Sequence, residues 1–178
     1  PTPAGTAAAP VEFCAGTTQS VQLANLLTGA DPGGQWTETS VKLSSPGAFQ
    51  ATTGTFQTNG QPAGTYTFRY SVQAAAPCPG QSATVTVILH ALPMADAGPD
   101  QTITCSQPTV TLGGPGTGAG MYNWTLQGAP AGNTAQINVS AGGVYTLVVT
   151  NTAGCTSADN TTVAVDNATP IAHRITVQ

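Results

Sequence analysis

The chain has 178 residues and a net charge of −4, and charged residues make up only 6% of it. Its three basic residues, Lys42, Arg69 and Arg174, cannot neutralise a phosphate backbone, which excludes nucleic-acid binding. They also give little attraction to an anionic membrane, and the sequence has no apolar run of spanning length, so membrane insertion is not expected.

The first part of the chain predicts an arm followed by short strands. Residues 1–10 are rich in Pro, Ala, Gly and Thr without periodicity, which predicts a flexible N-terminal arm. Residues 21–27 are mostly apolar and fit either a buried strand or a single helical turn. Gly54 interrupts an alternating segment, and we interpret it as a bulge. Strands are predicted at 36–39, 48–57, 65–72 and 83–89.

The second part repeats this plan after a junction at residues 91–100, where Pro93 and Pro99 indicate a semi-rigid linker. Its predicted strands lie at 102–105, 109–112, 122–126, 136–139, 144–150 and 161–165. Neither part has a helical period of useful length, so the chain is predicted to be all-β.

Two segments show the repeat most clearly, residues 64–68 (GTYTF) and residues 143–147 (GVYTL). Both enter a strand through Gly, carry an early Tyr and run on to a Cys in a turn. The repeat and the length together predict two domains of roughly 90 residues each. The expected division is an arm at 1–10, a β-sandwich at 11–90, a linker at 91–100, a second β-sandwich at 101–167 and a C-terminal strand or linker at 168–178.

Short strands at regular spacing with Gly/Pro turns are typical of two-sheet sandwiches. A Trp on an early strand and a Tyr that begins a late strand are core residues of immunoglobulin-like domains. We therefore expect two tandem immunoglobulin-like β-sandwiches, with Trp36 and Trp124 as core anchors. Tyr66 and Tyr145 are assigned to the same two cores.

Four cysteines occur at matching places, two in each unit. Three pairings are possible in principle, and the repeat favours one disulfide in each domain, Cys14 with Cys78 and Cys105 with Cys155. Metal binding is the alternative, but no C-x-x-C spacing is present. Each bridge would contribute roughly 4 kcal/mol and implies an oxidising, extracellular compartment. Because no signal peptide is present, we expect a mature protein or an excised segment.

Residues with catalytic chemistry are sparse. His90 and His173 have no acid patterned near them, so no Ser/His/Asp arrangement is indicated and the chain is not expected to be an enzyme. Asp96 and Asp100 lie on the linker, where their oxygen ligands fit a Ca²⁺ ion that would stiffen it. Turn formation by the same two side chains is the favoured alternative, and no other cofactor is expected.

Three motifs of the second unit resemble a known kind of repeat. Residues 96–104 (DAGPDQTIT), 122–124 (YNW) and 143–155 (GVYTLVVTNTAGC) resemble the PKD-like and Ig-like repeats of very large cell-surface adhesins from gliding and related Gram-negative bacteria. The first unit, with GGQW at 33–36 and AGTYTF at 63–68, looks like a sister repeat. Thr-Leu-Gln follows Trp124 in place of the acidic, Gly-rich continuation common in PKD domains, which favours the Ig-like label.

The resemblance implies a cell-surface setting, in which such repeats serve as stalks, adhesive modules or appendages of secreted hydrolases. We expect a non-catalytic extracellular protein with a structural or adhesive role, whose partners are further copies of itself or adjacent repeats. The alternative is a carbohydrate-binding accessory module of a secreted hydrolase, which would bind surface polysaccharide. Tyr70 and Tyr122 are the rings left for a sugar platform, since both Trp residues are assigned to cores.

The C-terminus suggests a strand without a sandwich of its own. Residues 168–172 (ATPIA) repeat the pattern of residues 91–95 (ALPMA), so the segment that follows corresponds to the first strand of a third unit. Ile171, Ile175 and Val177 alternate there, and an exposed apolar strand tends to pair with another chain. Either the chain is a fragment of a longer array, or this strand is donated to a neighbouring copy and builds a head-to-tail surface filament.

Overall fold

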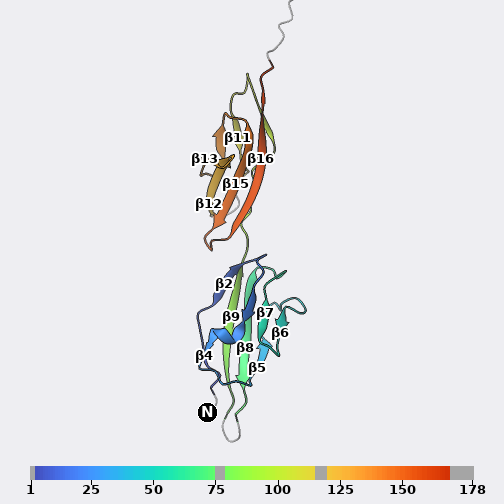
Figure 1. Ribbon diagram of the computed structural model, residues 1–178, viewed down its shortest axis with the longest axis vertical. Helices are drawn as coiled ribbons and strands as arrows, with labels where there is room; N and C mark the ends of the chain where they lie inside the picture. The colour runs from blue at the N-terminus through green and yellow to red at the C-terminus, as the bar shows by residue number, and fades with distance from the viewer. Residues whose placement is uncertain (1–2, 75–78, 115–119, 169–178) are drawn as a thin grey trace, which may run out of the picture. The chain divides into compact units, whose positions relative to one another are not determined.

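The computed structural model describes residues 3–74, 79–114 and 120–168 of the protein (Figure 1). The chain forms two compact units, unit 1 at Pro1–Ala91 and unit 2 at Leu92–Gln178. Apart from one short 3-10 turn, η1 (Leu23–Leu26), the regular elements of the described residues are strands, so the all-β prediction is confirmed. The described part contains no helix with the length and apolar character that crossing a membrane requires.

The main sheet of unit 1 has four strands in the order β2-β9-β8-β5. Its strands are β2 (Val11–Cys14), β9 (Gln81–His90), β8 (Gly64–Val72) and β5 (Gln35–Glu38). The first strand, β2, runs parallel to the last, β9, whereas the other neighbours are antiparallel. A parallel pair needs a long connection between its strands, and the chain between β2 and β9 provides one.

The opposite layer of unit 1 is built from shorter strands. A three-stranded sheet contains β3 (Ser20–Gln22), β7 (Thr55–Gln57) and β6 (Phe49–Gln50), and a two-stranded sheet contains β1 (Thr6–Ala7) and β4 (Leu27–Thr28). The apolar run at 21–27 therefore contains both elements considered for it, a strand and a helical turn. Gly54 lies in the turn between β6 and β7 with φ of +63°, so its interpretation as a bulge is wrong.

The N-terminal residues pack onto unit 1. Thr6 and Ala7 pair with Thr28 and Leu27, and Ala4 is buried at 2% exposure. The amide of Asp31 donates to the carbonyl of Pro3 at 2.9 Å. The predicted flexible arm is therefore wrong for residues 3–8, because their backbone groups pair with unit 1 and Ala4 fills its core.

Unit 2 has a main sheet of five strands in the order β10-β16-β15-β12-β13. Its strands are β10 (Gln101–Thr104), β16 (Thr156–Asp166), β15 (Gly143–Asn151), β12 (Gly120–Leu126) and β13 (Ala129–Gly132). As in unit 1, the first strand is parallel to the last. The opposite layer is the antiparallel pair β11 (Val110–Leu112) and β14 (Ile137–Val139).

Alternation along the strands builds one core in each unit. On β8, every second residue from Tyr66 to Val72 is buried, and on β15 the same holds from Tyr145 to Val149. Trp36 anchors the core of unit 1 and Trp124 that of unit 2, and Trp124 is fully buried. Each unit therefore has a core of its own, built around one Trp and the Tyr of its late strand.

Candidate functional site

The four aromatic residues assigned to cores all lie in them. The Tyr66 hydroxyl donates to the Pro62 carbonyl at 2.8 Å, and the Tyr145 hydroxyl donates to the Ala141 carbonyl at 2.9 Å. A Tyr at the start of a late strand that bonds four residues upstream is the tyrosine corner of immunoglobulin-like domains. Burial raises the pKa of both phenols, and the charge of Glu38 raises the pKa of Tyr66 further.

The cysteines differ from their predicted pairing. Cys14 and Cys155 are each disulfide-bonded, whereas Cys105 is free and exposed. The predicted bridge between Cys105 and Cys155 is therefore wrong, and unit 2 lacks the disulfide of its own that was expected. The predicted partner of Cys14, Cys78, lies outside the described residues.

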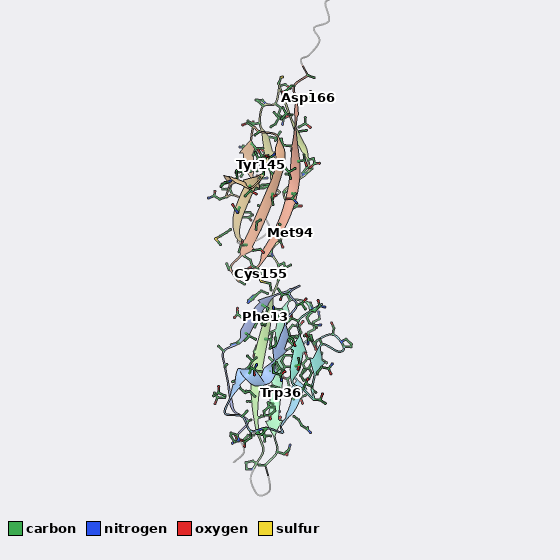
Figure 2. The ribbon with its side chains drawn as sticks, in the orientation of Figure 1. Phe13, Trp36, Met94, Tyr145, Cys155 and Asp166 are labelled. Atoms are coloured by element: carbon green, nitrogen blue, oxygen red, sulfur yellow. The ribbon has the colours of Figure 1, made fainter. Side chains whose placement is uncertain are left out.

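The parallel first strand explains this error. Cys105 follows Thr104, which pairs with Asp166 at the end of β16, whereas Cys155 precedes Thr156 at its beginning. Figure 2 shows Cys155 and Asp166 at opposite ends of unit 2. Ten residues of strand span about 33 Å, far beyond the roughly 7 Å limit between bridged Cα atoms. In unit 1, Cys14 likewise lies level with His90, the last residue of β9.

The two acidic residues proposed as calcium ligands bind backbone groups of unit 2. Asp96 Oδ1 accepts the amide of Gly98 at 3.0 Å, which makes the turn, and Asp100 Oδ1 accepts the amide of Thr162 at 2.8 Å. Asp159 Oδ2 accepts the amide of Ala97 at 2.8 Å. Residues 96–100 therefore attach the start of unit 2 to β16, and in this part they are not a linker.

This arrangement gives the DAGPD motif a structural role. The described residues contain no group of three or more His, Cys, Asp or Glu side chains that could hold a metal ion. A Ca²⁺ ion at Asp96 and Asp100 stays a prediction. The hydrogen bonds show the alternative, a turn, for Asp96 only, since Asp100 binds the backbone of β16.

The two tyrosines expected on the surface do not form a sugar platform. Tyr70 is only 7% exposed, and its ring stacks at a tilt on Trp36 with ring centroids 4.8 Å apart. Tyr122 is partly buried against the core of unit 2. The sequence carried a signal for Tyr70, because it lies two and four residues after Phe68 and Tyr66 and shares their face of β8.

The outer faces of the two main sheets differ in charge. In unit 1 this face includes Arg69 on β8, and Glu12 on β2 contacts His90 on β9 at 2.7 Å between Oε2 and Nε2. That pair was not expected from the sequence, because the parallel pairing of β2 and β9 brings together residues far apart in the chain.

On the corresponding face of unit 2, none of the outward side chains named below is charged. We call this surface the uncharged face. It is formed by the outward residues Thr102, Met121, Asn123, Thr125, Val144, Thr146, Val148, Thr150, Thr156, Ala158, Asn160, Thr162 and Ala164. Thr146 at its centre pairs with Asn160 on one side and Thr125 on the other. Asp166, the last residue of β16, is the first charge beyond it along that strand.

Comparisons with known proteins find likeness in structure. No protein-family model matches the chain, and no curated protein matches it in sequence. The insect immune protein hemolin superposes with a TM-score of 0.51 at 17% identity, over 90% of this chain and 46% of hemolin. A titin I-band fragment gives 0.48 at 14% identity over 88% of this chain and 62% of the fragment.

The four N-terminal Ig domains of Dscam1 isoform 1.9 give a TM-score of 0.42 at 14% identity, over 92% of this chain and 44% of that structure. The chain thus spans about half the length of the first solved structures that it matches. Together with the sheet order and the tyrosine corners, the hemolin superposition shows that the chain has an immunoglobulin-like β-sandwich fold.

Proposed function

We propose that this chain is a non-catalytic, extracellular structural and adhesive module, and that the uncharged face of unit 2 binds a second copy of the chain. The absence of charge on that face carries the proposal. Every copy has a net charge of −4, so two copies repel each other wherever their carboxylates meet. The uncharged face is a surface on which two copies can meet without that repulsion.

The chemistry of the face is also self-complementary. Thr hydroxyls and Asn amides each donate and accept hydrogen bonds, so they can pair with the same groups on a second copy. A carboxylate only accepts and cannot pair with another carboxylate. Val144 and Met121 add apolar area, with exposed fractions of 50% and 71%. A two-fold contact uses the same patch on both partners and needs groups of this kind.

The size of the face predicts a weak contact. Four strands spaced about 4.8 Å apart, over a length of about 26 Å, give an area of about 500 Å². Two such faces bury about 1,000 Å² in total, which is at the low end for specific complexes. Several repeats side by side would raise the strength of the contact through effective concentration, which suits adhesion in an array.

The extracellular setting is supported by the disulfide-bonded state of Cys14 and Cys155, since disulfides persist in oxidising compartments. Hemolin, which shares the fold, has a domain arrangement with implications for homophilic adhesion. We assign contacts between copies to this chain from the chemistry of the uncharged face.

Sedimentation velocity at increasing protein concentration tests the proposal. Wild-type protein is expected to associate reversibly between micromolar and millimolar concentration. Thr146→Glu combined with Asn160→Asp places a pair of like charges at the centre of the face and should leave monomers, because these charges would be desolvated against identical ones. Both side chains point to solvent in the monomer, so folding should persist, and circular dichroism checks it.

The matched control is Thr86→Glu, which adds a charge to the outer face of β9 in unit 1 and should leave association unchanged. Wild-type protein that stays monomeric at millimolar concentration would contradict the proposal. So would loss of association in the Thr86 variant alone.

A filament built by strand donation is a finer form of the same proposal. The donor residues Ile171, Ile175 and Val177 lie outside the described residues. Both units already hold a parallel first strand, β2 on β9 and β10 on β16, so a donated strand needs another edge. Deletion of residues 171–178 tests it: assembly by the truncated chain as by the full chain would refute donation, and uptake of an added 171–178 peptide would support it.

A further inference from the structure

The two core tryptophans differ in the partner of the indole N–H. Trp124 Nε1 donates to the carbonyl of Thr134 at 2.9 Å. Trp36 Nε1 has no acceptor among the described residues, although the side chain is only 8% exposed. No buried side-chain nitrogen or oxygen of the described residues lacks a partner, so this N–H reaches solvent.

A cleft lies where Trp36 reaches the surface of unit 1. It has a volume of about 480 Å³ and runs between the loop at 29–34, Thr52 and Thr53. The indole N–H lies at the Thr52–Thr53 wall, because a Cβ built on Gly54 would be 2.5 Å from Trp36 Nε1. Gly54 has φ of +63°, so this position favours glycine and leaves the N–H uncovered.

The other wall of the cleft is held in place by Tyr70. Its hydroxyl accepts the amide of Gly34 at 2.8 Å and donates to the carbonyl of Asp31 at 2.7 Å. The Asp31 amide is bound in turn by the carbonyl of Pro3 at 2.9 Å. These bonds fix the loop before any ligand arrives, which lowers the entropy that binding would otherwise cost.

Two polar groups of the cleft have no hydrogen-bond partner among the described residues, and they indicate which ligand groups the cleft can bind. The indole N–H of Trp36 needs an acceptor, and the Asp31 carboxylate, which has no partner among the described residues, needs a donor. A hydroxyl group can serve either one. The remaining lining includes apolar side chains, Ala24, Leu27, Ala30 and Pro32, which can pack against the C–H groups of a ligand.

Charge excludes other ligand classes. Among the described residues no basic side chain lines the cleft, and Asp31 is acidic, so an anion would be repelled. A metal cation would find one carboxylate beside an N–H donor that cannot bind it. The volume lies within the range of about 300–1,000 Å³ typical of small-molecule sites.

We infer that this cleft is a binding site for a neutral saccharide, with Trp36 Nε1 donating to a sugar oxygen and Asp31 accepting from a sugar hydroxyl. The site is on unit 1 and shares no residue with the uncharged face of unit 2. Saccharide binding and self-association can therefore fail independently of each other. The site also differs from the platform of Tyr70 and Tyr122 expected from the sequence, since Tyr70 acts here by holding the loop.

Nuclear magnetic resonance gives a direct test because the chain has two Trp residues and hence two indole N–H signals. The full-length protein would be titrated with cellohexaose, xylohexaose, mannohexaose and chitohexaose, with an alginate oligosaccharide as the anionic comparison. At least one neutral oligosaccharide is expected to shift the Trp36 indole signal and leave that of Trp124 in place. The alginate is expected to shift neither.

Two variants assign the binding energy. Asp31→Asn removes the charged acceptor from an exposed loop and should weaken binding by about tenfold, because bonds to charged groups are the stronger ones. Trp36→Phe keeps an aromatic ring but removes the N–H and should weaken binding by about fivefold. Trp124→Phe is the matched control: it removes the other indole N–H and should leave saccharide affinity unchanged.

The inference is wrong if none of the four neutral oligosaccharides shifts the Trp36 signal. It is equally wrong if Asp31→Asn binds as tightly as the wild type, since this variant alters no described side-chain contact and should fold normally.

Discussion

The two units share a sheet order, a tyrosine corner and a buried Trp. They differ in the hydrogen bonding of the Trp indole and in the charge on the outer face of the main sheet. In unit 2 the indole of Trp124 is bound by the backbone of Thr134, and the main sheet presents a face without charge. In unit 1 the indole of Trp36 opens to a cleft, and the outer face includes Arg69 and the pair of Glu12 and His90. The core therefore sets the fold, while a few hydrogen bonds decide which unit offers a site.

The largest expected difference concerns the cysteines. Without reductant, iodoacetamide should label Cys105 completely, because it is free and exposed. Cys14 and Cys155 should be labelled only after reduction, since both are disulfide-bonded. Peptide mapping by mass spectrometry measures this and identifies their bonding partners. Detection of Cys105 in a cross-linked peptide would contradict the described state.

Truncation of the two tryptophans compares the cores. Trp124→Ala should lower the free energy of unfolding of unit 2 by about 4 kcal/mol, because it leaves a cavity and an unpaired carbonyl. Trp36→Ala should cost less, since its N–H has no protein partner and its cleft already admits water. Denaturant unfolding measures both, and the remaining Trp reports by fluorescence on the unmutated unit. A larger loss for Trp36→Ala would reverse the comparison.

The tyrosine corners should contribute equally. Tyr66→Phe and Tyr145→Phe each remove one hydrogen bond to a backbone carbonyl and should each lower stability by about 1 kcal/mol. Thermal or denaturant unfolding of the single variants checks this. A loss confined to one unit would show that the second hydrogen bond is not formed in solution.

Alkaline pH should have the smallest effect. The unfolded chain releases its phenol protons near the ordinary pKa of 10.0, whereas burial raises the pKa of Tyr66 and Tyr145 in the folded chain. The stabilisation is therefore complete below pH 10.0 and falls as the pH rises through the folded values. Unfolding of the two Phe variants across this range should show a smaller slope. An unchanged slope in both would contradict burial as the cause.

Alternation along the strands made much of the fold predictable. The strands that carry Tyr66 and Tyr145, and those that carry Trp36 and Trp124, lie within a residue or two of their predicted places. Strand β13 was missed because Ala129-Pro130-Ala131-Gly132 has no β-branched or aromatic residue, and Pro130 is tolerated only because β13 is an edge strand.

The sites were less predictable because they depend on pairing between distant strands. Because the cysteines occupy matching places in the two repeats, a disulfide between Cys105 and Cys155 was expected. The parallel register of β10 on β16 instead places these two residues at opposite ends of unit 2. The uncharged face depends on the registers of β12, β15 and β16, which no single stretch of sequence reveals. The free indole of Trp36 depends on Gly54, whose place beside it follows from the packing of the two sheets.

We assign contact between copies to unit 2 and not to unit 1. A dilution series of amide spectra can distinguish the two units, because signals from both are followed at once. We expect concentration-dependent shifts at Thr125, Thr146 and Asn160 and their neighbours on the uncharged face, with β8 and β9 unchanged. Shifts centred on Arg69 and His90 of unit 1, or no shifts at millimolar concentration, would contradict it.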